Sequence, residues 1–351
     1  MLNGIQALNY GVADVAEAVR FLDDFGLIKV ESSPTYALYR LPEGSYISVR
    51  HIDDPALPKS SQVGYGVREV IWGVDEQASL DRYIADLRRD HEITESEDGT
   101  YRFVTSFGQA MGLKVFNKLP IVSSPSPANA PGMTQRFNQW RKWRQRAQPK
   151  QIMHAVFGYP DVNEALDFFR SRLHFRVTDV QVGIGVYLRM PGSSMHHNIA
   201  LMDADSPGSG ANGQLAFHHT NLIVEDIDEL MTAKWYMERQ GWSSSPFGVG
   251  RHRIGSALFL YLPSPLGGEM EYGADVDALD DTWVPHVWSL QFGFQAFLHS
   301  PPPFLMNEPE WKLEFCDGAT VRHTTFKELV ASGKLKPLPA IDANQLEKEH
   351  H

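Results

Sequence analysis

The chain contains an internal repeat that limits the folds open to it. Residues 5–30, IQALNYGVADVAEAVRFLDDFGLIKV, align without a gap with residues 152–177, IMHAVFGYPDVNEALDFFRSRLHFRV. The identical pairs include Gly11/Gly158, Asp14/Asp161, Val15/Val162, Glu17/Glu164, Ala18/Ala165, Phe21/Phe168 and Val30/Val177. Self-similarity at a fixed spacing is the signature of a duplicated structural unit. The sequence therefore predicts tandem copies of one unit.

Each copy has the pattern of a strand, a helix and further strands. An apolar segment leads to an aspartate in N-cap position and then to an amphipathic helix. Residues 67–87 and 215–235 resemble each other in the same way, and alternating segments such as VGIGVYLRM and ALFLYLP follow the helices. Four units in two tandem pairs predict an α+β fold.

The length of 351 residues allows two domains. We expect an N-terminal domain over residues 1–120, a linker over 121–150, a C-terminal domain over 151–290 and an extension over 291–351. The linker is a Pro/Ser/Ala-rich run followed by a basic, Trp-containing stretch. Because the chain carries a net charge of -11, we interpret that stretch as a surface segment and expect no nucleic-acid partner.

The composition also limits the partners and cofactors. The single cysteine, Cys316, excludes a cysteine-ligated zinc or iron–sulfur site. The sequence contains no run of about 18 apolar residues, so no membrane span is predicted. The N-terminus lacks the pattern of a signal peptide. We therefore expect a cytoplasmic protein that binds a small molecule, with any metal held by histidines and carboxylates.

Three polar residues interrupt apolar strands of the C-terminal pair. His154 lies in IMHAVF, His219 in AFHHTNL and Glu271 in GEMEY. Two imidazoles and one carboxylate are the donor set of non-haem Fe(II) oxygenases. A carboxylate on an apolar strand is costly unless it is paired or coordinated. The pattern favours a metal site.

The repeat supplies an internal comparison for this site. When the two halves are aligned, Ala7 corresponds to His154, Glu69 to His219 and Gly112 to Glu271. The N-terminal pair therefore lacks the ligand set, and the metal is expected in the C-terminal domain alone.

These motifs resemble the vicinal oxygen chelate superfamily, whose fold is that of glyoxalase and bleomycin-resistance proteins. Within it the chain is similar to type I extradiol catechol dioxygenases of the dihydroxybiphenyl dioxygenase kind. The resemblance covers roughly residues 5–290 and rests on IMHAVF, MHHNIAL, LAFHHTNL, and the GRH histidine followed by a tyrosine and EY. It implies four βαβββ modules, with mixed sheets curved around a metal pocket.

The resemblance also implies roles for individual residues. His154, His219 and Glu271 would hold Fe(II), or Mn(II), for meta-cleavage of a catechol-type aromatic diol with O2 as co-substrate. His197 would act as acid and base, while His252 and Tyr261 would contact the substrate. Val156, two residues after His154 on the same strand face, would line the pocket. Relatives of this kind often assemble as homo-oligomers, so a homo-oligomer is expected.

Two positions carry further expectations. Gly255 stands where many relatives have an aspartate, which predicts extra space for a larger or more substituted ring. His218, beside His219, should point to the opposite strand face if the strand is regular. His174, His286 and His299 have no supporting pattern.

Other functions remain open at this level. A glyoxalase-like lyase or isomerase shares the fold but needs a further carboxylate or glutamine ligand. A hydroxyphenylpyruvate-dioxygenase-like enzyme uses a similar triad but lacks the GRH and tyrosine pattern. A metal-free small-molecule binding module is the alternative outside catalysis, and the intact triad argues against it.

Overall fold

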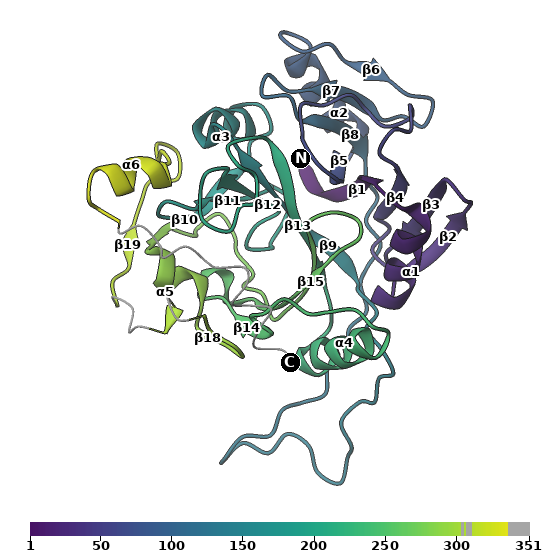
Figure 1. Ribbon diagram of the computed structural model, residues 1–351, viewed down its shortest axis with the longest axis vertical. Helices are drawn as coiled ribbons and strands as arrows, with labels where there is room; N and C mark the ends of the chain where they lie inside the picture. The colour runs from purple at the N-terminus through teal and green to yellow at the C-terminus, as the bar shows by residue number, and fades with distance from the viewer. Residues whose placement is uncertain (303–304, 307–310, 336–351) are drawn as a thin grey trace.

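The computed structural model describes residues 1–302, 305–306 and 311–335 (Figure 1). The rest of the expected extension, including everything after residue 335, lies outside the described residues. The N-terminal half comprises β1 (Leu2–Val12), α1 (Val15–Phe25), β2 (Ile28–Ser32), β3 (Tyr36–Arg40), β4 (Tyr46–His51), β5 (Gly66–Val74), α2 (Gln77–Leu87), β6 (Thr94–Glu95), β7 (Tyr101–Val104) and β8 (Ala110–Val115).

The C-terminal half repeats this order. It comprises β9 (Gln151–Tyr159), α3 (Val162–Ser171), β10 (Arg176–Gln181), β11 (Gly185–Arg189), β12 (Ile199–Asp203), β13 (Ala216–Ile223), α4 (Ile227–Arg239), β14 (Val249–Arg251), a short turn (Ile254–Ser256), β15 (Leu258–Pro263) and β16 (Glu269–Ala274). Each half is thus two βαβββ modules, which confirms the four-module prediction.

Each half forms one mixed sheet. The first has the strand order β2-β3-β4-β1-β5-β8-β7-β6, and the central part of the second has the matching order β14-β15-β16-β13-β9-β12-β11-β10. The first strands of the two modules, β1 with β5 and β9 with β13, pair antiparallel at the centre of each sheet. Residues of the two modules of a half therefore meet there.

The helix starts follow from the repeated sequence. Asp14 accepts a hydrogen bond from the backbone N–H of Glu17, and Asp161 accepts from the N–H groups of Asn163 and Glu164. These bonds satisfy backbone donors that a helix leaves free at its first turn. The predicted N-caps of α1 and α3 are therefore confirmed.

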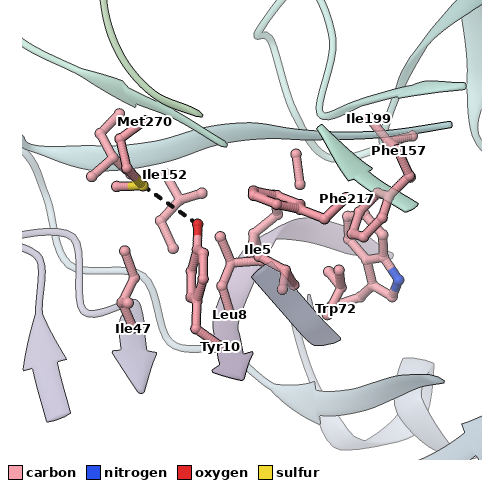
Figure 2. Packing of buried hydrophobic residues seen from close by; sticks show 14 of the residues in the cluster. Ile5, Leu8, Tyr10, Ile47, Trp72, Ile152, Phe157, Ile199, Phe217 and Met270 are labelled. Carbon is pink, nitrogen blue, oxygen red and sulfur yellow. Dashed lines mark hydrogen bonds between the residues drawn. The ribbon is translucent and has the colours of Figure 1, made fainter. Parts of the chain in front are cut away.

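The two sheets share one hydrophobic core. Figure 2 shows Tyr10 of β1 and Trp72 of β5 near Ile152 and Phe157 of β9 and Phe217 of β13, all of which are buried. The Tyr10 hydroxyl donates to Thr220 Oγ1 at 2.9 Å across the boundary between the halves. The N-terminal sheet therefore supports the strands that carry the predicted metal ligands.

The segment after residue 285 belongs to the second sheet. It contains β17 (His286–Trp288), α5 (Leu290–Phe294), β18 (Phe297–Leu298), β19 (Glu314–Phe315) and α6 (Phe326–Ala331). β17 pairs with β10, and β18 pairs with β14, so the segment adds strands at both edges of that sheet.

The predicted linker is an extended loop below α4 in Figure 1, and Trp140 and Trp143 on it are 84% and 85% exposed. Its return arm is anchored because Arg144, buried itself, contacts Glu225 and Asp226 at the start of α4. In the described part of the chain, no helix combines the length and apolar character needed to cross a membrane.

Candidate active site

The three predicted ligands meet on adjacent strands. His154 lies on β9, His219 on β13 and Glu271 on β16, and all three side chains are buried. The Nε2 atoms of His154 and His219 lie 3.1 Å apart. Glu271 Oε2 lies 3.3 Å from His154 Nε2 and 3.4 Å from His219 Nε2. One ligand atom from each residue lies within 4.8 Å of the other two. The strand pairing thus brings together residues that are far apart in sequence.

These side chains fit a divalent metal. Glu271 Oε2 is buried without a hydrogen-bond partner, and an unsatisfied buried carboxylate oxygen is costly. Burial lowers the pKa of His219 well below its ordinary value, so its ring is neutral and offers a lone pair. A cation between the three atoms would satisfy them together, and this donor set suits Fe(II) and related metals.

His218 orients His219, contrary to the expectation that it points away. The register of β13 shifts between Phe217 and His219, so the strand is irregular where His218 lies. His218 Nε2 donates to the Gly208 carbonyl at 2.9 Å, and His218 Nδ1 lies 2.6 Å from His219 Nδ1. Because burial lowers the pKa of His218, its ring is neutral, and its Nδ1 accepts a hydrogen bond from the Nδ1–H group of His219. His219 Nε2 is then left as a ligand.

His197 lies against the predicted ligands. It is 7% exposed, and its ring stacks on that of His154 with centroids 4.2 Å apart. Burial, with the charges of neighbouring histidines, lowers its pKa well below the ordinary value. A neutral imidazole in this position can accept a proton from a bound substrate.

His252 and Tyr261 form a linked pair beside His219, whose ring centroid lies 5.2 Å from that of Tyr261. His252 Nδ1 donates to the Phe294 carbonyl at 2.5 Å, and its Nε2 lies 3.1 Å from the Tyr261 hydroxyl. Burial lowers the pKa of His252; burial and the charge of Glu271 raise that of Tyr261 well above its usual range. Both groups are therefore neutral. Phe294 belongs to α5, so the extension helps to orient a predicted substrate contact.

All seven predicted site residues line one cavity of about 240 Å³: His154, Val156, His197, His219, His252, Tyr261 and Glu271. β9, β11, β12, β13, β15 and β16 all contribute to its wall, so the sheet curves around it. The remaining lining is mainly apolar and includes Val186, Leu201, Phe247, Leu290, Phe294 and Leu305. No lysine or arginine is among the lining residues that the structure describes.

The expected space at Gly255 is filled. A Cβ atom at this position would lie 2.8 Å from Cγ of His196, and the backbone φ of +66° is one that side-chain-bearing residues rarely adopt. His196 is fully buried and pairs with Asp179. The prediction of extra room for a larger ring at Gly255 was therefore wrong, because a histidine ring occupies that room.

Strand register confirms the comparison with the N-terminal half. In the second sheet, Asn221 is paired with His154 on one neighbouring strand and with Glu271 on the other. In the first sheet, Ile71 is paired in the same way with Ala7 and Gly112. Two residues earlier on each strand, Glu69 corresponds to His219. The same register puts Arg102 where Tyr261 lies. Arg102 Nε pairs with Glu69 Oε1 at 3.0 Å. In the N-terminal half, an ion pair therefore occupies the place that the predicted metal ligands occupy in the C-terminal half.

Sequence reasoning missed several cavity residues. Glu269 lines the cavity, and burial with the nearby charge of Glu271 raises its pKa to about 7. Its spacing of two from Glu271 on a strand was the available signal, because such residues share a face. Leu290 and Phe294 come from the extension, where no sequence pattern pointed to the site.

Comparison with known proteins agrees with this geometry. Residues 151–257 match the model of the Glyoxalase/Bleomycin resistance protein/Dioxygenase superfamily. The chain is 29% identical over 273 residues to metapyrocatechase 2 of Cupriavidus necator, across 76% of this chain and 79% of that protein. These matches confirm the resemblance of the chain to this superfamily, also known as the vicinal oxygen chelate superfamily.

Solved structures share the superfamily fold across most of the chain. BphC, a halotolerant catechol dioxygenase, has a TM-score of 0.66 at 18% identity, over 90% of this chain and 99% of that one. The Mn(II)-bound glyoxalase from Novosphingobium aromaticivorans has a TM-score of 0.63 at 20% identity, over 92% and 95%. Since both chemistries occur on this fold, the choice between them depends on the site residues.

Proposed function

We propose that this protein is an extradiol dioxygenase that cleaves a catechol ring and inserts both atoms of O2. One observation carries the proposal: the buried His154, His219 and Glu271 group opens into a cavity that His197, His252 and Tyr261 also line. The similarity to metapyrocatechase 2 supports it.

The residues divide the chemical work. Fe(II), or Mn(II), held by the three ligands would lower the pKa of the catechol hydroxyls and bring the substrate and O2 together. His197 takes a proton from the substrate and later returns one. The Tyr261 hydroxyl donates to His252 Nε2 in the unbound site, and it would turn its O–H to the substrate oxygen when the substrate binds; such donors are most effective where water is excluded.

The cavity wall favours an uncharged catechol with an apolar substituent. Its lining is mainly apolar, and the described lining has no cation to pair with a substrate carboxylate. We expect 3-methylcatechol and 2,3-dihydroxybiphenyl to be turned over better than a catechol that bears a carboxylate.

We also propose that the enzyme is cytoplasmic and forms a homo-oligomer. Cell fractionation would check the first expectation, and light scattering would check the second.

The first experiment is anaerobic purification with metal analysis, followed by addition of these catechols in air. About one Fe or Mn per chain and a yellow, O2-dependent product would support the proposal. His154→Ala, His219→Ala and Glu271→Ala should lose both metal and turnover, whereas His197→Phe should keep the metal and lose most turnover. Full ring cleavage by His197→Phe would contradict its acid–base role.

Two alternatives have distinct outcomes. A glyoxalase-like lyase or isomerase would act without consuming O2, and the fold shared with the Mn(II)-bound glyoxalase makes that assay worth including. A protein that purifies without stoichiometric metal and binds catechols unchanged would instead be a binding module.

A further inference from the structure

A buried chain of hydrogen bonds leads away from His197. His196 Nδ1 lies 2.9 Å from His197 Nδ1, and His196 Nε2 lies 2.9 Å from Asp179 Oδ2. Asp179 and His196 are both completely buried. The other oxygen, Asp179 Oδ1, accepts the backbone N–H of His286 at 2.9 Å. Neither Asp179 nor His196 lines the cavity, so the proposed reaction gives them no direct task.

The order of donors and acceptors along this chain is fixed from the carboxylate. A carboxylate only accepts, so His196 Nε2 must carry the proton shared with Asp179. In the neutral ring, His196 Nδ1 then has a lone pair, which requires His197 Nδ1 to be the donor. His197 Nε2 is therefore unprotonated, and it has no partner among the described residues.

The backbone at Gly255 leaves room for the hydrogen-bonded series from His197 to Asp179. Gly255 leaves the space that the His196 ring fills, since a Cβ there would lie 2.8 Å from the ring. Asp179 comes from β10, His196 and His197 precede β12, and His286 begins β17. β10, β17 and the turn at Gly255 thus converge around a pair of histidines that are adjacent in sequence.

We propose that Asp179 and His196 are positioning residues that hold His197 in the tautomer whose Nε2 accepts the proton of the substrate hydroxyl. The inference rests on the proposed function. The substrate O–H bond breaks, its electron pair stays on oxygen, and the proton forms an N–H bond at His197 Nε2. The resulting imidazolium keeps its Nδ1–H bond to His196, whose partner Asp179 offsets the new charge.

Asp179→Asn tests the proposal with little change of shape. The backbone N–H of His286 needs an acceptor, so the amide oxygen should remain there and the NH2 group should face His196. His196 Nε2 must then accept and its Nδ1 must donate, which reverses the chain and protonates His197 Nε2. We expect kcat to fall about 10- to 100-fold, with KM and metal content unchanged. Asp203→Asn is the matched control, because Asp203 is also buried and pairs with a histidine, His323.

A second measurement reports the tautomer without catalysis. Long-range 1H–15N spectra of the full chain loaded with diamagnetic Zn(II) and labelled at histidine should show His197 protonated at Nδ1, with the signal assigned from His197→Phe. Asp179→Asn should move the proton to Nε2, and Asp203→Asn should not.

The outcomes separate this inference from the proposed function. No ring cleavage by the wild-type enzyme would refute the proposed function, whereas the Zn(II) spectra would still test the tautomer. An active wild type with an unchanged kcat and tautomer in Asp179→Asn would overturn the positioning role alone. Equal losses of kcat in Asp179→Asn and Asp203→Asn would also overturn it, because that result reports general destabilisation.

Discussion

At the scale of single residues, two pairs of adjacent histidines at the site, His196–His197 and His218–His219, have the same hydrogen-bond arrangement. In both HisHis pairs, the first histidine is anchored by an acceptor, and its Nδ1 meets Nδ1 of the second. The anchor is the Gly208 carbonyl for His218 and the Asp179 carboxylate for His196. One pair thereby orients the proposed metal ligand His219, and the other orients the proposed base His197.

Replacing His218 by Phe should weaken metal binding. Without the Nδ1 acceptor, His219 can place its proton on Nε2, which the metal must then displace. We expect a loss of about 10- to 100-fold in affinity, measured by competition with a chelator. His218→Asn offers an amide oxygen near the same place and should retain most of the affinity. Equal affinities in wild type and His218→Phe would show that His218 does not orient its neighbour.

The sequence predicted the metal ligands but not the residues that orient them. His154, His219 and Glu271 could be recognised because they break apolar strands in one half only. The role of His218 depends on the irregular register of β13, and that of Asp179 depends on a contact between separate strands. Neither leaves a periodic signal, so neither could be predicted from spacing.

At the scale of elements, the extension completes the cavity. Leu290 and Phe294 of α5 line it, and the Phe294 carbonyl orients His252. The βαβββ pattern was predictable because each module repeats it. The position of α5 was not, because it depends on the pairing of short strands at the two edges of the sheet.

Leu290→Trp tests this wall. A larger side chain reduces the space for a substituent but lies on the extension, outside the ligand strands. We expect KM for 2,3-dihydroxybiphenyl to rise about tenfold, the equivalent of roughly 1.4 kcal/mol, with KM for catechol nearly unchanged. The control is Val284→Trp at an exposed position. A parallel rise in both KM values would indicate general distortion.

The anchor of the linker at α4 should respond to acid. Burial opposes ionisation of Glu225, but Lys142, the Ser124 N–H and Arg144 outweigh it and lower its pKa from 4.5 to about 2. Since the folded value lies below the ordinary one, the stabilisation is complete above about pH 4.5 and is lost as the pH falls towards 2.

Glu225→Gln should therefore destabilise the protein by about 2 kcal/mol near neutral pH, and less as the pH is lowered. Chemical denaturation of both proteins from pH 7 downwards would measure the difference. Glu238→Gln, at an exposed ion pair with Lys234, is the control and should change little. A difference that stayed constant down to pH 3 would contradict the assignment.

At the scale of the whole molecule, the two halves are joined by a common interior. Phe25 of α1 stacks on Tyr272 of β16 with ring centroids 3.8 Å apart, and the Tyr272 hydroxyl donates to the Phe25 carbonyl. The duplication was visible in sequence. This joint was not, because apolar residues in both halves reveal burial but not the surface on which they pack.

The halves should unfold together. Phe25→Ala removes a buried ring at the joint and should cost about 3–5 kcal/mol, lowering Tm while leaving a single calorimetric transition. The reason is that cavity formation weakens the packing of both sheets at once. Two resolved transitions, with only the first moved by the substitution, would instead indicate independent halves.

The Glu69–Arg102 pair gives the molecule an internal reference. The N-terminal half carries the same framework, strand for strand, with a salt bridge in place of reactive groups. A spectroscopic or calorimetric signal of the metal should therefore count one centre per chain rather than two. The N-terminal half thus supplies a reference within the same polypeptide, against which the effect of each proposed site residue can be judged.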